Sequence, residues 1–374
     1  MVTREDVENI ALLSKLFVPE EELDGLTKSM QEIIDFADTI NNAPTDGEEF
    51  DDINNLSNVF REDEVVESYD TKEILSNAPE QAEDHFLVRN REQGGVKMGS
   101  IEKIHEMLVS KECSCTELTK SYLDEIEKAD GELNAYVNVT GEEALKTAEA
   151  VDRKIASGEE IGMLEGVPMT LKDNISTKGI ETTCCSKILT GYKPIYNATV
   201  WETLAGENAV MLGKTNMDEF AMGSSCETSY FGGAMNPFDS NYVSGGSSGG
   251  VASAVGANIA AYGLGSDTGG SIRQPASFCG IVGLKPTYGA VSRYGLIAYA
   301  SSLDQIGPIT KSVEDAAIVF DAISKRDEKD STSKGFVGDT YSKLNNDIKG
   351  MKIGIAKEYL EGVRDDVKEA VLKA

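Results

Sequence analysis

The residues best suited to chemistry in this chain are two serines, Ser247 and Ser271, each surrounded by glycine within residues 244–280. Glycine adopts backbone conformations that other residues resist, so main-chain N–H groups can converge on one point. A serine beside such N–H groups is what an acyl-transfer nucleophile needs, because the N–H groups stabilise the oxyanion. A flexible Gly/Ser linker is the alternative, but a linker would not contain an apolar run such as 251–255.

No histidine is well placed to act as the base for such a serine. The chain has only His85, in an acidic stretch, and His105, in a helical pattern before the serines, which argues against a Ser-His-Asp triad. A lysine can replace histidine when burial keeps part of it neutral near pH 7. Lys172 follows the apolar run 167–171, which reads as a strand that delivers the side chain into a cleft. The pattern favours Lys172 as the base over an ordinary surface lysine.

Nucleotide and metal sites are not supported by the motifs of this chain. Gly213-Lys-Thr215 resembles a P-loop, but Asn208 stands where the earlier glycine is required. The pair Gly263 and Gly265 resembles a dinucleotide fingerprint, but Thr268 occupies the third glycine position. No cluster of metal-ligating residues has suitable spacing. We expect no metal and no cofactor to be bound by this chain.

The composition indicates an acidic protein with its charge concentrated near the N-terminus. The formal net charge is −29, and residues 1–97 hold 8 basic against 25 acidic residues, or −17. Such a charge argues against direct binding of nucleic acid. No apolar run approaches the roughly 18 residues that cross a bilayer, and the N-terminus is no signal peptide, so we expect a cytoplasmic protein without a membrane partner. The six cysteines lack zinc-site spacing and read as small buried side chains.

The elements that would position these residues fall into two parts. Residues 3–42 have the periodicity of two amphipathic helices, and residues 43–93 read as an acidic arm that orders by wrapping another protein. Beyond residue 100, helical patterns alternate with short apolar strands, which is typical of an α/β sheet. The predicted helices are 101–129, 141–157 and 365–374, and the predicted strands are 167–171, 209–212, 261–264 and 351–355.

Residues 244–280 resemble the amidase signature. Lys172, Ser247 and Ser271 fall at the positions of that family's Ser–cis-Ser–Lys triad, with the serines 24 residues apart and the lysine 99 residues before the second. Further segments resemble one branch closely, the A subunit of the tRNA-dependent amidotransferase: 165–174, 214–223 and 303–308. The first 93 residues resemble the C subunit of the same enzyme. The chain is therefore similar to a C–A fusion.

The resemblance implies a domain organisation and a fold. It implies a C-like helical module with an arm at 1–93, a junction at 94–97 and an amidase-signature domain at 98–374. That domain is expected to have a mixed sheet flanked by helices. The A-like part stops over a hundred residues before the family pattern ends, so we expect a C-terminally truncated sheet.

The resemblance also implies roles for particular residues. Ser271 would attack the side-chain amide of glutamine, and Ser247, preceded by a cis peptide bond, would pass its proton to neutral Lys172. The expected oxyanion donors are the backbone N–H groups of Thr268, Gly269, Gly270 and Ser271. Met222, Gly223 and Ser224 would line the acyl pocket, with a plain core methionine as the alternative for Met222.

The function implied is that of a component of the glutamyl-tRNA(Gln)/aspartyl-tRNA(Asn) amidotransferase, a heterotrimeric ligase of protein biosynthesis. This chain would release ammonia from glutamine. Its partner, the B subunit, would bind the misacylated tRNA and use ATP and Mg²⁺ to activate it. Two alternatives remain open, namely a stand-alone amidase and a non-catalytic assembly protein of the same complex.

Overall fold

The computed structural model describes residues 2–13, 18–41, 81–82, 85–86, 99–336, 338–344 and 349–374. The chain divides into two compact units, Met1–Val88 and Arg89–Ala374, which are treated separately. Of the predicted arm, only the paired strands β1 (Gln81–Ala82) and β2 (His85–Phe86) are described, and the junction 94–97 lies outside the described residues. The expected domain boundaries therefore stay a prediction.

The first unit contains the two helices predicted at its start, α1 (Arg4–Leu13) and α2 (Glu20–Asn41). Thr3 and Asp6 form a capping box, because each backbone N–H donates to the side chain of the other, at 2.8 and 3.2 Å. The Arg4 guanidinium of α1 lies 3.2 Å from Glu20 of α2, so the two helices are joined by an ion pair as well as by packing.

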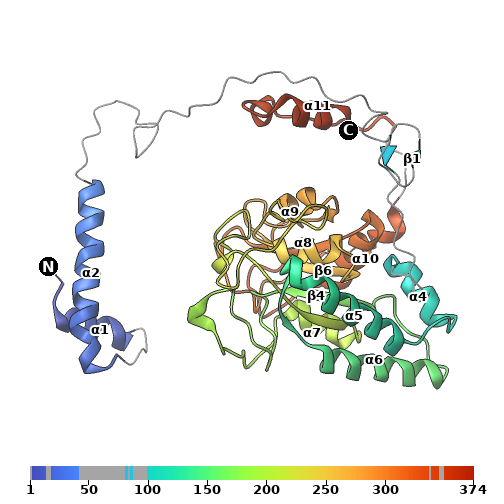
Figure 1. The fold of residues 1–374 in the computed structure, drawn as a ribbon, viewed down its shortest axis with the longest axis horizontal. Helices are drawn as coiled ribbons and strands as arrows, with labels where there is room; N and C mark the ends of the chain where they lie inside the picture. Colours follow the sequence, from blue (N-terminus) through green and yellow to red (C-terminus); the bar gives the residue numbers. More distant parts are fainter. Residues whose placement is uncertain are drawn as a thin grey trace. The chain divides into compact units, whose positions relative to one another are not determined.

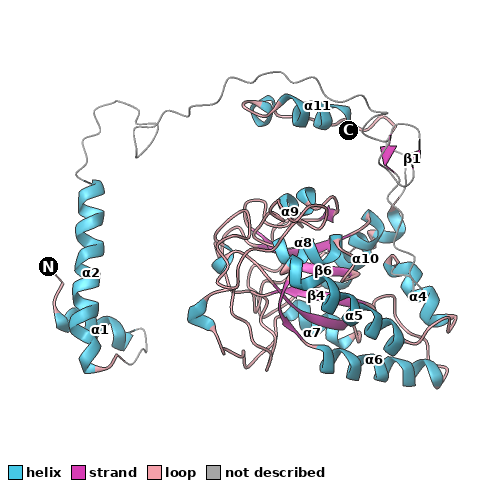
Figure 2. Cartoon of the chain, viewed as in Figure 1, coloured by secondary structure: helices cyan, strands magenta, loops and turns pink. Residues whose placement is uncertain are grey.

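The second unit is built on a six-stranded mixed sheet, whose strands are magenta in Figure 2; the strand order is β3-β5-β4-β6-β8-β7. β4 is parallel to both of its neighbours, and the other pairings are antiparallel. The strands are β3 (Tyr136–Val139), β4 (Pro168–Lys172), β5 (Val210–Thr215), β6 (Tyr262–Asp267), β7 (Val282–Gly283) and β8 (Gln305–Thr310). The expected mixed sheet is confirmed, with the three strands predicted in this part of the sequence at β4, β5 and β6. All three are buried along their length, as strands covered on both faces must be.

Helices surround this sheet (Figure 1). The helical pattern at 101–129 is two helices rather than one, because Lys111 adopts a φ of +60° and Ser114 opens a new capping box with Glu117. Near the C-terminus, α11 is confirmed as a helix. The α-helices of this unit are α4 (Ile101–Val109), α5 (Cys115–Leu133), α6 (Gly141–Ala156), α7 (Thr199–Gly206), α8 (Gly249–Gly256), α9 (Arg273–Phe278), α10 (Val313–Ile323) and α11 (Asp365–Lys373).

Helix α8 positions the first of the two glycine-flanked serines. The helix is buried from Gly249 to Val255 and contacts β4, β5, β6 and β8. A side chain at Gly250 would place its Cβ 2.5 Å from the backbone of Asn216, so only glycine permits this close approach. The start of α8 is thereby held against the residues that follow β5.

The prediction of a strand at 351–355 is wrong. Residues 351–356 have no regular structure, and Met351 and Ile353 are 65% and 75% exposed. Among the described residues this segment pairs with no strand, and an unpaired strand leaves its backbone hydrogen bonds unmade. None of the described helices combines the length and the apolar character that crossing a membrane requires.

Candidate active site

The predicted base and relay serine meet at one edge of the sheet. Lys172 is the last residue of β4, and β6 ends nearby because the two strands are parallel neighbours with Leu171 opposite Leu264. Carboxyl ends of parallel neighbours lie at the same sheet edge, which is where such sheets place their sites. Ser247 reaches this edge from the turn before α8, and both Lys172 and Ser247 are fully buried.

The Lys172 amine is surrounded by serine oxygens. Its Nζ lies 2.6 Å from Ser247 Oγ, 2.9 Å from Ser266 Oγ and 3.3 Å from the Ser266 carbonyl oxygen. A neutral amine has two N–H donors and one lone pair. When both Ser266 oxygens accept from Nζ, the lone pair faces Ser247 Oγ, which is the orientation needed to receive a proton from that hydroxyl.

Burial lowers the pKa of Lys172 to about 8, against the opposing influence of nearby groups such as Asp218 and Asp267. A sizeable neutral fraction is therefore present near pH 8. The peptide bond between Gly246 and Ser247 is cis, as the resemblance implied.

Sequence reasoning missed Ser266 as a functional residue. It occupies the second-last position of β6 and also accepts a hydrogen bond from Asn174 Nδ2 at 2.9 Å. The signal was its place in the serine-rich segment, but its contact with Lys172 depends on the register of β4 against β6. That register is not visible in a strand pattern.

The loop that carries Ser271 runs from β6 into α9 and is organised by Asp267. This buried carboxylate accepts from the backbone N–H of Gly270 at 2.8 Å and of Ile272 at 3.0 Å. The Arg273 guanidinium makes two further bonds to it, each at 3.0 Å. Bidentate pairing of this kind fixes orientation as well as distance. Ser271 lies in this turn and is largely buried, with 9% of its surface exposed.

One of the four expected oxyanion donors is already engaged in a hydrogen bond. The N–H of Gly270 already donates to Asp267, so it is not free to receive an oxyanion. In the described part of the chain, the N–H groups of Thr268, Gly269 and Ser271 donate to no other acceptor. Thr268 Oγ1 donates to Asp304 Oδ1 at 2.5 Å, which anchors this residue of the loop. Of the four expected donors, these three N–H groups stay a prediction.

The loop of Ser271 is joined through the backbone to Ser248, the residue after Ser247. The N–H of Ser248 donates to the Ser271 carbonyl oxygen at 3.0 Å. Within the described residues, no hydrogen bond links Ser247 Oγ to Ser271 Oγ. The structure therefore brings Lys172 and Ser247 into direct contact and places the Ser271 loop beside them.

The residues predicted for the acyl pocket lie in a neighbouring loop. Met222 is 57% exposed, which excludes a core methionine. A Cβ on Gly223 would lie 2.2 Å from Asp218 Oδ1, so this loop lies tightly against a buried carboxylate. The carbonyl oxygen of Ser224 accepts a side-chain hydrogen bond from α9.

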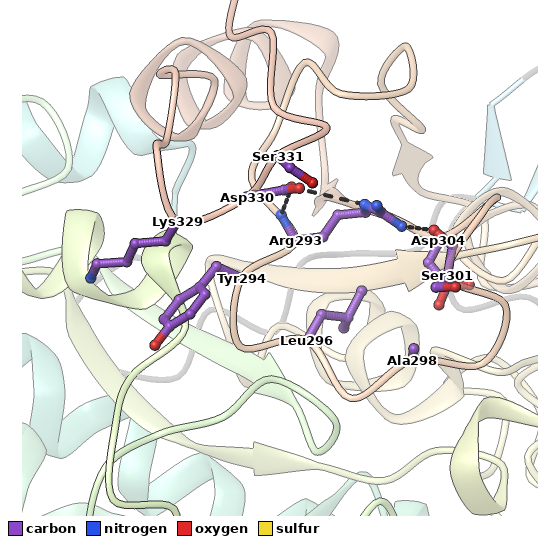
Figure 3. A pocket seen from close by; sticks show the side chains of 9 residues that line it. All are labelled: Arg293, Tyr294, Leu296, Ala298, Ser301, Asp304, Lys329, Asp330 and Ser331. Atoms are coloured by element: carbon purple, nitrogen blue, oxygen red, sulfur yellow. Dashed lines mark hydrogen bonds and ion pairs between the residues drawn. The ribbon is translucent and has the colours of Figure 1, made fainter.

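A separate cavity of about 240 Å³ lies around Arg293 (Figure 3). None of the predicted site residues lines it. Its lining contains two cationic side chains, Arg293 and Lys329, and two carboxylates, Asp304 and Asp330. Asp304 lines this cavity and also accepts a hydrogen bond from Thr268. The cavity therefore adjoins the loop 268–271, which carries the expected oxyanion donors. The lining residues are Arg293, Tyr294, Leu296, Ala298, Ser301, Asp304, Lys329, Asp330 and Ser331.

No cluster of three metal-ligating side chains occurs within the described residues. The six cysteines are free and buried, which confirms the prediction that they pack as small apolar side chains.

Replacing Ser266 with alanine tests the orientation of the Lys172 amine. We expect the rate at which a fluorophosphonate acylates Ser271 to fall about tenfold, because one of the two acceptors that direct the lone pair is lost. Adduct formation is followed by intact mass. Ser253→Ala is the matched control, since the hydroxyl of this buried serine donates to the Met235 carbonyl oxygen and makes no hydrogen bond to Lys172 among the described residues. Equal losses in both variants would show that Ser266 has no special role.

Comparison with known proteins identifies both parts of the chain. The amidase family model matches residues 117–374, and the model of the Glu-tRNAGln amidotransferase C subunit matches residues 18–88. The A subunit of glutamyl-tRNA(Gln) amidotransferase from Staphylococcus carnosus is 53% identical over 281 residues, which are 75% of this chain and 58% of that protein. Its counterpart from Carboxydothermus hydrogenoformans is 57% identical over 274 residues, 73% and 56% of the two chains.

Solved structures agree with this assignment. The glutamyl-tRNA(Gln) amidotransferase A subunit from Thermotoga maritima superposes with a TM-score of 0.66 at 41% identity, covering 75% of this chain and 60% of that chain. A peptide amidase from Stenotrophomonas maltophilia gives 0.59 at 36% identity, covering 66% and 50%. The chain thus spans somewhat over half the length of the relatives it matches. The expected amidase-signature fold and the C-like and A-like segments are confirmed, and the chain belongs to the amidase family.

Proposed function

We propose that this chain is the glutaminase component of a glutamyl-tRNA(Gln)/aspartyl-tRNA(Asn) amidotransferase, with Lys172, Ser247 and Ser271 as catalytic residues. The observation that carries the proposal is the 2.6 Å contact between the buried Lys172 amine and Ser247 Oγ, beside the loop of Ser271. The family gives the reaction class, amide hydrolysis. The names of the related amidotransferase proteins support tRNA amidation as the purpose, and the resemblance of the sequence implies glutamine as the amide.

In the proposed reaction, Ser271 Oγ attacks the side-chain amide carbon of glutamine. Its proton passes to Ser247 Oγ, while the Ser247 proton passes to the lone pair of Lys172. The resulting oxyanion accepts from the N–H groups of Thr268, Gly269 and Ser271, and each such donor is worth roughly 3 kcal/mol in the transition state.

Collapse of this intermediate breaks the carbon–nitrogen bond. The proton held by Lys172 returns through Ser247 to the departing nitrogen, which leaves as ammonia. Water then attacks the glutamyl ester, and the same relay takes its proton and returns it to Ser271, releasing glutamate. Protons and bonds balance without any added cofactor.

The second half of the reaction belongs to a partner in this proposal. The B subunit would bind misacylated tRNA and use ATP and Mg²⁺, since the net charge of −29 makes this chain a poor ligand for nucleic acid. The C-like module and arm, residues 1–93, would contact the B subunit, joined through 94–97 to the amidase-signature part at 98–374 in a heterotrimer-like assembly. We place this assembly in the cytoplasm, where tRNA serves translation.

The test measures ammonia release from glutamine by the full chain, alone and co-purified with a B subunit. We expect ammonia in the co-purified sample and, with ATP, Mg²⁺ and Glu-tRNA(Gln), transfer to the tRNA. A co-purified complex that neither releases ammonia nor accepts a fluorophosphonate on Ser271 would contradict catalysis and favour an assembly role.

A stand-alone amidase is the second candidate function. The likeness at 32% identity to a solved aryl acylamidase, and at 36% to peptide amidases, favours it. Hydrolysis of anilides or peptide amides by the chain without its B partner, at a rate above that for glutamine, would establish this alternative.

A further inference from the structure

Gln274 uses both ends of its side-chain amide to join two segments of the site. It lies in the first turn of α9, three residues after Ser271, and its own N–H donates to the Gly270 carbonyl at 2.7 Å. Gln274 Oε1 accepts from the Gly246 N–H at 2.9 Å. Gln274 Nε2 donates to the Ser224 carbonyl oxygen at 2.8 Å.

The peptide that leads into Ser247 is held on its other side by Asp218. A Cβ on Gly246 would lie 2.0 Å from Asp218 Oδ2, so no side chain fits between them. Asp218 is in turn fixed by the N–H of Cys226 at 3.0 Å and by Thr228 Oγ1 at 2.9 Å. Gly246 therefore lies between the buried Asp218 carboxylate and the side-chain amide of Gln274. These two contacts fix the position of Ser247, the next residue.

We propose that Gln274 is a positioning residue that sets Ser247 against Lys172 and, through Ser224, fixes the loop 222–226 beside the acyl group. The inference rests on the proposed function of Ser271 and Ser247. A side chain at this position must accept from one backbone and donate to another, and an amide does both. Glutamate can only accept when ionised, and methionine, of similar length, replaces neither bond.

The two bonds predict separable effects on acylation of the full chain by a fluorophosphonate, analysed as a maximal rate constant and an apparent affinity. Gln274→Met loses both bonds, so we expect the rate constant to fall about tenfold and the affinity to weaken several-fold. Gln274→Glu keeps the acceptor for Gly246 but repels the Ser224 carbonyl. We expect it to keep the rate constant within about threefold while the affinity weakens as in Gln274→Met.

The matched control is Ser277→Ala, an exposed serine one turn further along α9. Ser271 labelling is measured by intact mass, and thermal unfolding checks that each variant is folded. The inference is overturned if Gln274→Met matches the wild type in both constants, or if Gln274→Glu loses rate constant and affinity together. That second outcome decides the matter even if Gln274→Met fails to fold. An unlabelled wild type instead overturns the proposed function itself, and the inference with it.

Discussion

Replacing Ser271 with alanine is expected to abolish covalent labelling by a fluorophosphonate and to lower ammonia release from glutamine by at least about a thousandfold. The hydroxyl is the only part of the site proposed to bond to the substrate carbon, and the hydroxyl of Thr268 in the same loop is held by Asp304. Intact mass reports the adduct, and an ammonia assay on the complex with a B subunit reports turnover.

Two features make this result decisive. Ser277→Ala removes an exposed hydroxyl from α9, the short helix that follows Ser271, and should leave both measurements unchanged. An adduct that persists in Ser271→Ala, and that mapping places on Ser247, would reverse the assignment of nucleophile and relay. The loop should stay folded in the variant, because its shape is fixed by Asp267 and Arg273 and not by the Ser271 hydroxyl.

The strands that could be predicted are those whose own residues favour a buried strand. Apolar runs indicate β4, β5 and β6, which lie in the middle of the sheet. β8 is not among the predicted strands. It contains Gly307 and Pro308, which disfavour a strand, and antiparallel pairing with β6 along five residue pairs imposes its conformation. The segment 351–355 is the opposite case. Its residues have a strand-like pattern, but it pairs with no strand among the described residues.

The same distinction, between local signals and contacts made by the fold, applies to the residues of the site. The prediction that Lys172 contacts Ser247, and the choice of Ser271 as the proposed nucleophile, rest on local signals: glycine-flanked serines and a lysine after an apolar strand. Ser266 and Gln274 could not be predicted, since their roles arise from contacts across 94 and 28 residues of sequence. The engagement of the Gly270 N–H could not be predicted either, because it depends on the orientation of the Asp267 carboxylate. Local chemistry thus points to the proposed reacting groups, and only tertiary contacts point to the residues proposed to orient them.

Replacing Lys172 with methionine is expected to slow acylation of Ser271 by about a hundredfold to ten-thousandfold, the usual worth of a general base. In the wild type, the rate should rise with pH through about 8, because burial lowers the pKa of Lys172 to about 8 and only the neutral amine accepts the proton. Below that pH, each further decrease of one pH unit should reduce the rate about tenfold, because the neutral fraction of Lys172 falls tenfold. The variant should lose this dependence.

The fold should tolerate the change. Among the described residues Lys172 forms no ion pair and contacts only serine oxygens through its amine, so methionine fills a similar volume without leaving a carboxylate unpaired. Lys178→Met, at an exposed lysine six positions later, is the matched control and should retain both the rate and its pH profile. A Lys172→Met protein whose rate still rises through pH 8 would show that another group receives the proton. The relay through Ser247 would then lose its acceptor, because the amine 2.6 Å from Ser247 Oγ is the base that the relay requires.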